Sequence, residues 1–476
     1  MITENDSPRR AASYTCNSVN IVLISTYELG HQPFGLASPA AWLRKRGHEV
    51  VCLDLSRQAL DEAALRGARL IAFYVPMHTA TRLALQLIEP LRRFNQRAQF
   101  CAYGLYAPLT EKSLRKLGVE FLFGGEFEEA LAQLADRLAI GRDNPEEITP
   151  VTAEKITSLA RQRFEIPDRT GLPPLRQYAH VVLPSGEHRT AGYTEASRGC
   201  KHLCRHCPIV PVYKGVFRIV DRETVLADIR QQVAAGAQHI TFGDPDFFNG
   251  IGHALAITEA LHNEFPQLTF DATIKVEHLR QHEKHLPTLR DAGCLFVTTA
   301  VESLDDEVLL KLEKGHTRAD FLHVVQKFRE LGLTLQPTFV PFTPWTTLES
   351  IQDLLETLNE LQLAYAVPPI QLGIRLLIPA GSRLLELQDV QNFIDPFDEK
   401  LLLHPWRHPD PRVDALSEEI QDIVAASEKL KRARSATFER IWQATKQAAG
   451  QTAELDAMPV LAARAAVPYL NEPWYC

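Results

Sequence analysis

The chain has 476 residues, enough for about three domains of ordinary size. It carries 51 lysine and arginine residues and 59 aspartate and glutamate residues, for a formal charge of -8. That balance argues against a polybasic nucleic-acid binder and against an electrostatic membrane anchor. Hydrophobic residues make up 45% of the chain and charged residues 23%, as in ordinary globular proteins, so disorder is not expected.

The chain begins without a basic segment followed by an apolar run, and it has no stretch of about 18 consecutive apolar residues. A secretory signal and a membrane-spanning helix are therefore not predicted. Eight cysteines are too few for a disulfide scaffold, and three of them cluster, which in a reducing compartment points to metal binding or catalysis. We expect a soluble cytoplasmic protein that has neither nucleic acid nor a membrane as its partner.

The first part of the chain alternates short apolar runs with helical patterns. Strands are predicted at 20–25, 48–54, 69–75, 99–103 and 119–123. This alternation predicts a parallel sheet covered on both faces. We expect a Rossmann-like, doubly wound domain at 18–140, with ligands bound beyond the carboxyl ends of its strands.

A charged, proline-containing segment at 141–190 is predicted to be a linker with short extended pieces and no core of its own. Strand–helix alternation resumes over 191–390. The strands predicted there are 192–196, 239–242, 269–272, 295–300, 334–340 and 371–378. Six such units favour a partial (β/α)6 barrel, and 391–476 is predicted to be a helical C-terminal extension and tail. The fold class is therefore α/β.

Three cysteines, Cys200, Cys204 and Cys207, lie in one loop after the first predicted barrel strand. Spacings of four and three residues allow their sulfurs to converge on one centre, and soft thiolates suit iron–sulfur or zinc sites. The alternatives are unligated thiols and a structural zinc site with His202 or His206 as the fourth ligand. Three cysteines without a further cysteine pair suit a [4Fe–4S] cluster with one open iron better than they suit zinc.

This loop, with its CxxxCxxC spacing, resembles the signature of the radical SAM superfamily, where it follows the first strand of a partial barrel. In that family the open iron binds S-adenosylmethionine (SAM), and an electron from the cluster cleaves the sulfonium to give a 5′-deoxyadenosyl radical. The resemblance implies a [4Fe–4S] cluster, SAM and an electron donor such as flavodoxin or ferredoxin. It covers nearly all of 190–390.

Two further turns resemble places where the family contacts SAM. The turn with Gly243, Asp244 and Asp246 resembles one that meets the methionine amino group, and the alternative is an ordinary loop with a helix-capping aspartate. Glu302 and Ser303 resemble a strand end that approaches the ribose and the methionine. The alternative for Glu302 is a carboxylate stabilised at a helix N-terminus.

Other residues are candidates to line a cavity at the carboxyl ends of the barrel strands. Lys275 and Glu277 are predicted to share one face of a strand and to act on the substrate, with a salt-bridged strand end as the alternative. Arg198 and Arg375 are further candidates. Pro341 stands where the family often has a glycine in a turn that contacts adenine.

The first domain resembles the cobalamin-binding module that precedes the barrel in one large class of radical SAM proteins. The resemblance rests on 103–108, on a Gly-Glu-x-Glu turn within 118–128, and on the order of the domains. The motif DxHxxG, whose histidine ligates cobalt in many cobalamin proteins, is absent, and neither His31 nor His78 has the required neighbours. Cobalamin would therefore bind without a protein nitrogen ligand or through an unrecognised one. The alternative is a degenerate domain that only docks on the barrel.

The last six residues, 471–476, resemble the end of a radical SAM group described by a Cys-Sec-Ala-Glu-Pro or Cys-Cys-Ala-Glu-Pro tail. If a selenocysteine codon followed Cys476, the protein would extend further. The thiol–selenol pair would then bind a soft atom or carry reducing equivalents. Cys476 is on this basis a candidate catalytic residue, and the alternative is an incidental thiol at a frayed terminus.

These features predict a radical SAM enzyme that modifies a small-molecule or peptidic substrate. The reaction expected is cobalamin-linked methylation or carbon–heteroatom bond formation. The alternative is a non-catalytic protein that binds a metal or an iron–sulfur cluster, or acts as a redox sensor.

Overall fold

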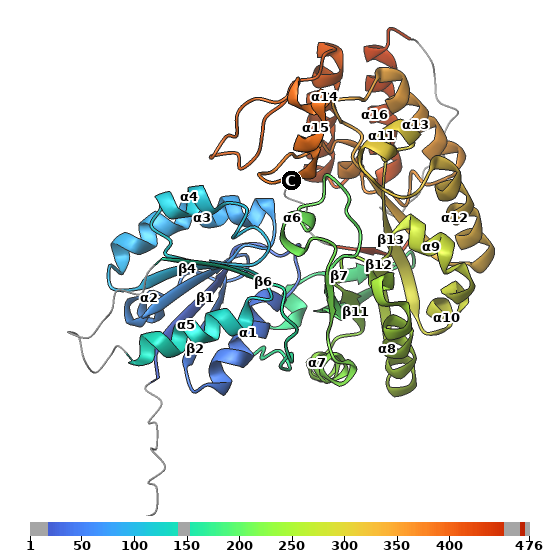
Figure 1. The fold of residues 1–476 in the computed structure, drawn as a ribbon. Helices are drawn as coiled ribbons and strands as arrows, with labels where there is room; N and C mark the ends of the chain where they lie inside the picture. Colours follow the sequence, from blue (N-terminus) through green and yellow to red (C-terminus); the bar gives the residue numbers. More distant parts are fainter. Residues whose placement is uncertain (1–17, 141–152, 452–466, 472–476) are drawn as a thin grey trace, which may run out of the picture.

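The computed structural model of the chain describes residues 18–140, 153–451 and 467–471. Its strands form two large sheets and one short hairpin, and helices surround both large sheets (Figure 1). The first sheet belongs to the N-terminal part of the chain and the second to the middle part. The α/β fold class predicted from the sequence is confirmed.

The first sheet has six parallel strands in the order β2-β1-β3-β4-β5-β6. The strands are β1 (Asn20–Ser25), β2 (Glu49–Asp54), β3 (Leu70–Tyr74), β4 (Gln99–Tyr103), β5 (Phe121–Gly125) and β6 (Glu154–Ser158). The helices are α1 (Phe34–Lys45), α2 (Glu62–Gly67), α3 (His78–Phe94), α4 (Glu111–Lys116) and α5 (Glu128–Ile140).

Both faces of this sheet are buried because successive residues of each strand point into two different cores. Ile21 and Leu23 pack with α1 and α5, whereas Val22 and Ile24 pack with α2, α3 and α4. A parallel sheet with helices on both faces is a doubly wound sheet, as predicted. Its strand order changes direction between β1 and β3.

The segment predicted to be a linker supplies an edge strand to one sheet and a strand to the other. β6 pairs in parallel with β5, and β7 (His180–Val182) pairs antiparallel with β8 (His188–Thr194). The edge position suits β6 because Ile156 is its one apolar residue, and a central parallel strand would be buried on both faces. The extended pieces expected in this segment are therefore parts of the two sheets.

The second large sheet has the order β14-β13-β12-β11-β8-β7-β15. Its first five strands in this order, from β14 to β8, are parallel. Its other strands are β11 (His239–Phe242), β12 (Thr269–Thr273), β13 (Cys294–Glu302), β14 (Thr334–Phe339) and β15 (Tyr469–Leu470). The helices that follow are α7 (Arg222–Ala234), α8 (Ile251–Glu264), α9 (Val276–Gln281), α10 (Leu286–Asp291), α11 (Asp306–Lys311), α12 (Arg318–Leu331) and α13 (Leu348–Glu360). They cover the outer face of a curved, partial barrel (Figure 1).

The sixth barrel strand, predicted at 371–378, is not a regular strand. The structure has a 3-10 helix there, η4 (Pro369–Leu372), and a single bridge that joins Phe342 to Arg375. Proline has no backbone N–H to donate to a ladder, and Pro368, Pro369 and Pro379 flank this segment. The barrel therefore has five regular parallel strands among the described residues.

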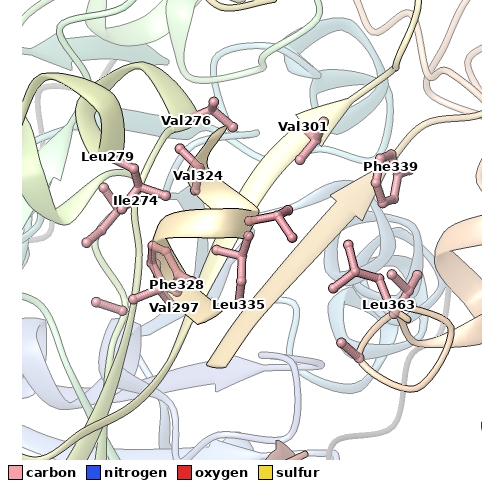
Figure 2. Packing of buried hydrophobic residues seen from close by; sticks show 14 of the residues in the cluster. Ile274, Val276, Leu279, Val297, Val301, Val324, Phe328, Leu335, Phe339 and Leu363 are labelled. Atoms are coloured by element: carbon pink, nitrogen blue, oxygen red, sulfur yellow. The ribbon is translucent and has the colours of Figure 1, made fainter. Parts of the chain in front are cut away.

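The barrel core is one continuous cluster of apolar side chains. Figure 2 shows Val297 and Val301 of β13 packed with Val324 and Phe328 of α12 and Leu335 of β14. The C-terminal helices α15 (Pro411–Lys429) and α16 (Arg434–Ala448) add side chains to the same cluster. No helix in the described ranges combines the length and apolar character needed to cross a membrane.

Phe328→Ala tests whether this cluster stabilises the barrel. The ring of Phe328 is almost fully buried, so its loss is expected to lower the free energy of unfolding of the barrel by about 3–5 kcal/mol. Urea unfolding followed by far-UV circular dichroism measures the change. Leu310→Ala is the control, because Leu310 is 76% exposed and is expected to change stability by less than about 0.5 kcal/mol. Equal losses in the two variants would contradict the packing described here.

Candidate active site

The cysteine loop leaves β9 (Ser197–Gly199) and returns through α6 (Val210–Tyr213) to β10 (Phe217–Ile219), which pairs antiparallel with β9. Gly199 has a φ of 72°, and a Cβ there would collide with the carbonyl oxygen of Val216, so glycine is required where the loop begins. The loop is thereby held at the carboxyl end of the first barrel strand.

The three thiols of this loop share one neighbourhood. Cys200 and Cys204 are buried, and Cys207 is partly exposed. Burial, together with the charges of Cys204 and Cys200, raises the pKa of Cys207 to about 12. Such mutual electrostatic effects require the three sulfurs to lie close together.

This donor set fits an iron–sulfur cluster. Thiolates are the ligands that such clusters take, and three of them leave one iron of a [4Fe–4S] cluster without a protein ligand. Both ring nitrogens of His202 lie within 3.5 Å of carboxylate oxygens, and Nε2 of His206 lies 3.2 Å from Oε1 of Glu302. The two imidazoles proposed as a fourth zinc ligand thus face carboxylates, which favours the three-thiolate site over zinc.

Glu302 and Lys314 form a buried ion pair beside the cysteines, with 3.1 Å between Nζ and Oε1. Burial opposes the charge of Glu302, but Lys314 and His206 hold the pKa of its carboxyl well below the usual range. Burial likewise opposes the charge of Lys314, and Glu302, Cys204 and Cys207 raise its pKa. Lys314 is therefore a buried cation close to the cluster thiols. Spacing along the sequence does not indicate this role, since the charges around Lys314 come from distant segments.

The turn after β11 is built around two buried carboxylates. Asp244 accepts hydrogen bonds from the N–H of Ala196 at 2.9 Å and from Oγ of Ser197 at 2.5 Å, so it holds the start of the cysteine loop. Desolvation raises the pKa of Asp244 to about 7. Asp246 caps the short helix η2 (Phe247–Gly250) through Oδ1. A Cβ on Gly243 would collide with the ring of Tyr193, so this position also needs glycine.

Lys275 and Glu277 lie together but not on one strand face. β12 ends at Thr273, and Glu277 belongs to α9, so the predicted alternation along a strand is wrong. Nζ of Lys275 lies 3.1 Å from Oε2 of Glu277, which is the salt-bridged strand end that the sequence left open. Oε2 of Glu277 also lies 3.4 Å from Nδ1 of His202 in the cysteine loop.

Glu302, Ser303 and Pro341 line one pocket of about 220 Å³ beyond the ends of β13 and β14. The structure thus brings together three of the residues predicted to contact SAM. A larger hollow of about 440 Å³ involves α3, α4 and the first residues of β4. It lies near the amino end of β4, whereas the cysteine loop contacts the turn that follows the carboxyl end of β5. It includes none of the predicted site residues.

Arg198, two residues before Cys200, joins the cysteine loop to the first sheet. Its guanidinium lies 2.7 Å from Glu128 and 3.4 Å from Glu126, which follow β5, and 2.6 Å from Glu195. Both Glu126 and Glu128 are buried. The Gly-Glu-x-Glu turn and the cysteine loop are therefore in direct contact.

One residue proposed for the site lies elsewhere. Arg375 pairs with Asp414 at 2.6 Å and stacks on Trp406, so it binds the C-terminal extension instead of lining the cavity at the strand ends. Cys476 lies outside the described residues, and its predicted role stays a prediction.

The family model of the Radical SAM superfamily matches residues 194–359, from the end of β8 to α13. The matched segment contains the three cysteines and the ends of the five regular barrel strands. Residues 194–359 are thus similar to the radical SAM superfamily, as the cysteine loop led us to expect. This finding gives no support to the non-catalytic metal-binding or redox-sensor alternative.

Relatives and solved structures extend the likeness to the first sheet. An uncharacterized methyltransferase of Pyrococcus horikoshii is 24% identical over 380 residues, which are 76% of this chain and 79% of that protein. The radical SAM methyltransferase TsrM from Kitasatospora setae, solved with tryptophan and a SAM analogue, superposes with a TM-score of 0.59 at 19% identity. That match covers 78% of this chain and 76% of TsrM. The cobalamin-dependent radical SAM enzyme OxsB gives a TM-score of 0.67 at 15% identity, over 87% of this chain and 67% of OxsB.

The raised pKa of Asp244 predicts a pH-dependent stability. Because desolvation raises this pKa to about 7, the folded protein keeps a proton that the unfolded chain releases near pH 4. The stabilisation is full below about pH 4 and is lost as the pH rises through 7. This group is expected to lower the free energy of unfolding of the wild type by about 2–3 kcal/mol between pH 5 and pH 8. The asparagine side chain in the variant Asp244→Asn cannot titrate, so the variant should lack this decrease.

Urea unfolding of the wild type and of Asp244→Asn at the two pH values measures this effect. Asp291→Asn changes an exposed carboxylate and should leave the pH dependence of the wild type unchanged. If Asp244→Asn keeps the full wild-type dependence, then Asp244 is not the buried acid described here.

Proposed function

We propose that the chain is a SAM-dependent methylating enzyme whose [4Fe–4S] cluster is held by Cys200, Cys204 and Cys207. The observation that carries the proposal is the contact between two parallel sheets at their carboxyl ends, through Arg198 and Glu128. Ligands of parallel α/β sheets and of barrels bind at these ends. Two cofactors, one at each sheet, would then lie near each other.

The chain's own residues bind and orient the groups at the cysteine loop. When bound, the cluster and SAM supply one-electron reductive chemistry at a sulfonium. Lys314 offsets negative charge next to the thiolates, and Glu302 fixes Lys314 and His206. Asp244 holds the backbone at Ala196 and Ser197, which sets the start of the loop. Glu302, Ser303 and Pro341 then contribute the wall of a pocket for part of the nucleotide.

The first sheet offers a place for cobalamin. Its β2-β1-β3-β4-β5 order changes direction between β1 and β3, where ligands of such sheets bind. Oγ of Ser25, at the end of β1, and Oε2 of Glu28 are buried without a hydrogen-bond partner in the described ranges. These groups fit a polar ligand at this edge. TsrM and OxsB, described as a radical SAM methyltransferase and a cobalamin-dependent enzyme, support the assignment.

The same edge has no histidine placed for cobalt among the described residues. Nε2 of His78 lies 2.6 Å from the carbonyl oxygen of Leu401, and His31 is buried against the ring of Tyr193. Cobalamin would then bind without an imidazole from these two residues. The substrate class we propose is a small molecule or a peptide.

Other parts of the assignment rest on sequence alone. We propose a cytoplasmic enzyme that receives electrons from a flavodoxin or a ferredoxin. Membership of the group with a Cys-Sec-Ala-Glu-Pro or Cys-Cys-Ala-Glu-Pro tail, with Cys476 as a working thiol, rests on the resemblance of 471–476.

Reductive cleavage of SAM tests the cluster. Anaerobic reconstitution with iron and sulfide, followed by dithionite and SAM, should release 5′-deoxyadenosine, which chromatography with mass detection quantifies. Cys204→Ala removes one of three cluster ligands and is expected to lower the release to the level of protein without iron. Cys294→Ala, which removes a thiol buried at the start of β13, should keep the wild-type yield. Release that is the same in Cys204→Ala and in the wild type would contradict the proposal.

Binding of hydroxocobalamin tests the role of the first sheet. After incubation and gel filtration, the wild type should retain an equimolar amount of cobalt with the absorption spectrum of a protein-bound corrinoid. Since Nε2 of His78 lies 2.6 Å from the carbonyl oxygen of Leu401, His78→Gln should retain the same amount and the same spectrum. Wild-type protein that retains no cobalt would instead favour direct radical or aminocarboxypropyl chemistry, with a first domain that only docks on the barrel.

A further inference from the structure

Three ligand-type atoms converge beside the cysteine loop, and none of them belongs to a cysteine. They are Nε2 of His202 in the loop, Oδ2 of Asp246 after β11, and Nδ1 of His278 in α9, and all lie within 4.8 Å of one another. Nδ1 of His278 is 2.7 Å from Oδ2 of Asp246, and Nε2 of His202 is 3.5 Å from it. Ligands held at about 2.1 Å from one zinc ion lie roughly 3–3.5 Å apart, so one ion fits among these atoms with small shifts.

These same three atoms are buried and have no hydrogen-bond partner within the described part of the chain. Although the atoms are close, the angles at the imidazole nitrogens and the carboxylate oxygen do not satisfy hydrogen-bond geometry. Asp246 is fully buried, and its other oxygen, Oδ1, accepts a hydrogen bond from the N–H of Phe248 at 3.2 Å. Oδ2 of Asp246 thus has imidazole nitrogens nearby but no hydrogen bond of good geometry, and a bound cation would stabilise its buried charge.

Glu277 lies behind His202 as a supporting carboxylate. Its Oε2 is 3.4 Å from Nδ1 of His202, the ring nitrogen that does not face Asp246. Histidines that bind metals commonly donate their second N–H to a carboxylate, which fixes the tautomer and the ring orientation. Lys275 lies 3.1 Å from the same oxygen and keeps Glu277 in place.

We propose that His202, Asp246 and His278 bind one divalent transition-metal ion, Zn²⁺ or Fe²⁺, at a mononuclear site separate from the cluster thiolates. Two imidazoles and one carboxylate suit these ions, whereas Mg²⁺ and Ca²⁺ prefer oxygen ligands alone. Three protein ligands leave a coordination position for water or a substrate group. Because His202 lies between Cys200 and Cys204, the ion would tie the cysteine loop to the segments that follow β11 and β12.

Zinc retention tests this site without SAM and without turnover, so its result is independent of the tests of the proposed function. Cluster-loaded protein is incubated anaerobically with Zn²⁺, passed over a gel-filtration column, and analysed for zinc, iron and sulfide. The wild type should retain an equimolar amount of zinc in addition to the cluster iron. His278→Gln should lose zinc affinity by at least about tenfold with unchanged iron and sulfide.

His282→Gln is the matched control, because its ring lies one helical turn on, 5.8 Å from that of His278, and is not one of the three converging ligands. It should retain zinc as the wild type does. Glu277→Gln leaves the three ligands in place and should weaken zinc binding by about 10–100-fold, which keeps the test open if His278→Gln does not fold. Cluster-loaded wild type that retains no zinc, or zinc affinity unchanged in both His278→Gln and Glu277→Gln, would overturn the proposal.

Discussion

The ion pairs of Arg198 are the constraint on which the arrangement of the two sheets depends. One buried guanidinium contacts Glu126 and Glu128 from the first sheet and Glu195 from the second part of the chain. Removal of one member of a buried ion pair leaves an uncompensated charge and typically costs about 3–5 kcal/mol. Because Arg198 precedes Cys200 by two residues, the position of the cysteine loop depends on the position of the turn after β5.

The electrostatics of this junction explain how one cation serves three carboxylates. Desolvation raises the pKa of Glu126 to about 7, so this carboxyl is partly protonated near neutral pH, and Oη of Tyr213 donates a hydrogen bond to it at 3.2 Å. The negative charge buried there is thus smaller than that of three fully ionised carboxylates.

A second contact lies nearby, where Arg169 binds Asp228 of α7 and Oε1 of Gln32, both at 2.8 Å. Two arginines therefore join the first sheet to the barrel.

Local patterns were sufficient for the parts of the site that are contiguous in sequence. The cysteine spacing and the strand–helix alternation predict the loop and both sheets, because these depend on neighbouring residues. Contacts between residues far apart in the sequence could not be predicted from such local patterns. His278 lies in a short helix whose sequence gives no sign that Asp246 and His202 face it. The sixth strand shows that an apolar run need not pair along its length, because over 371–378 the one bridge formed joins Arg375 to Phe342.

The cysteine loop is held on both sides by imidazole–carboxylate contacts, with His202 against Asp246 and His206 against Glu302. Burial raises the pKa of Cys200 and of Cys207, so without a metal these two thiols stay protonated and add no negative charge to the loop. Iron ligation requires the thiolates, and burying that added negative charge is possible only with compensation. Lys314 would supply part of it, and bound iron the rest. Cluster binding and the local fold of the loop would therefore be coupled, and the ion pairs of Arg198 would extend that coupling to the first sheet.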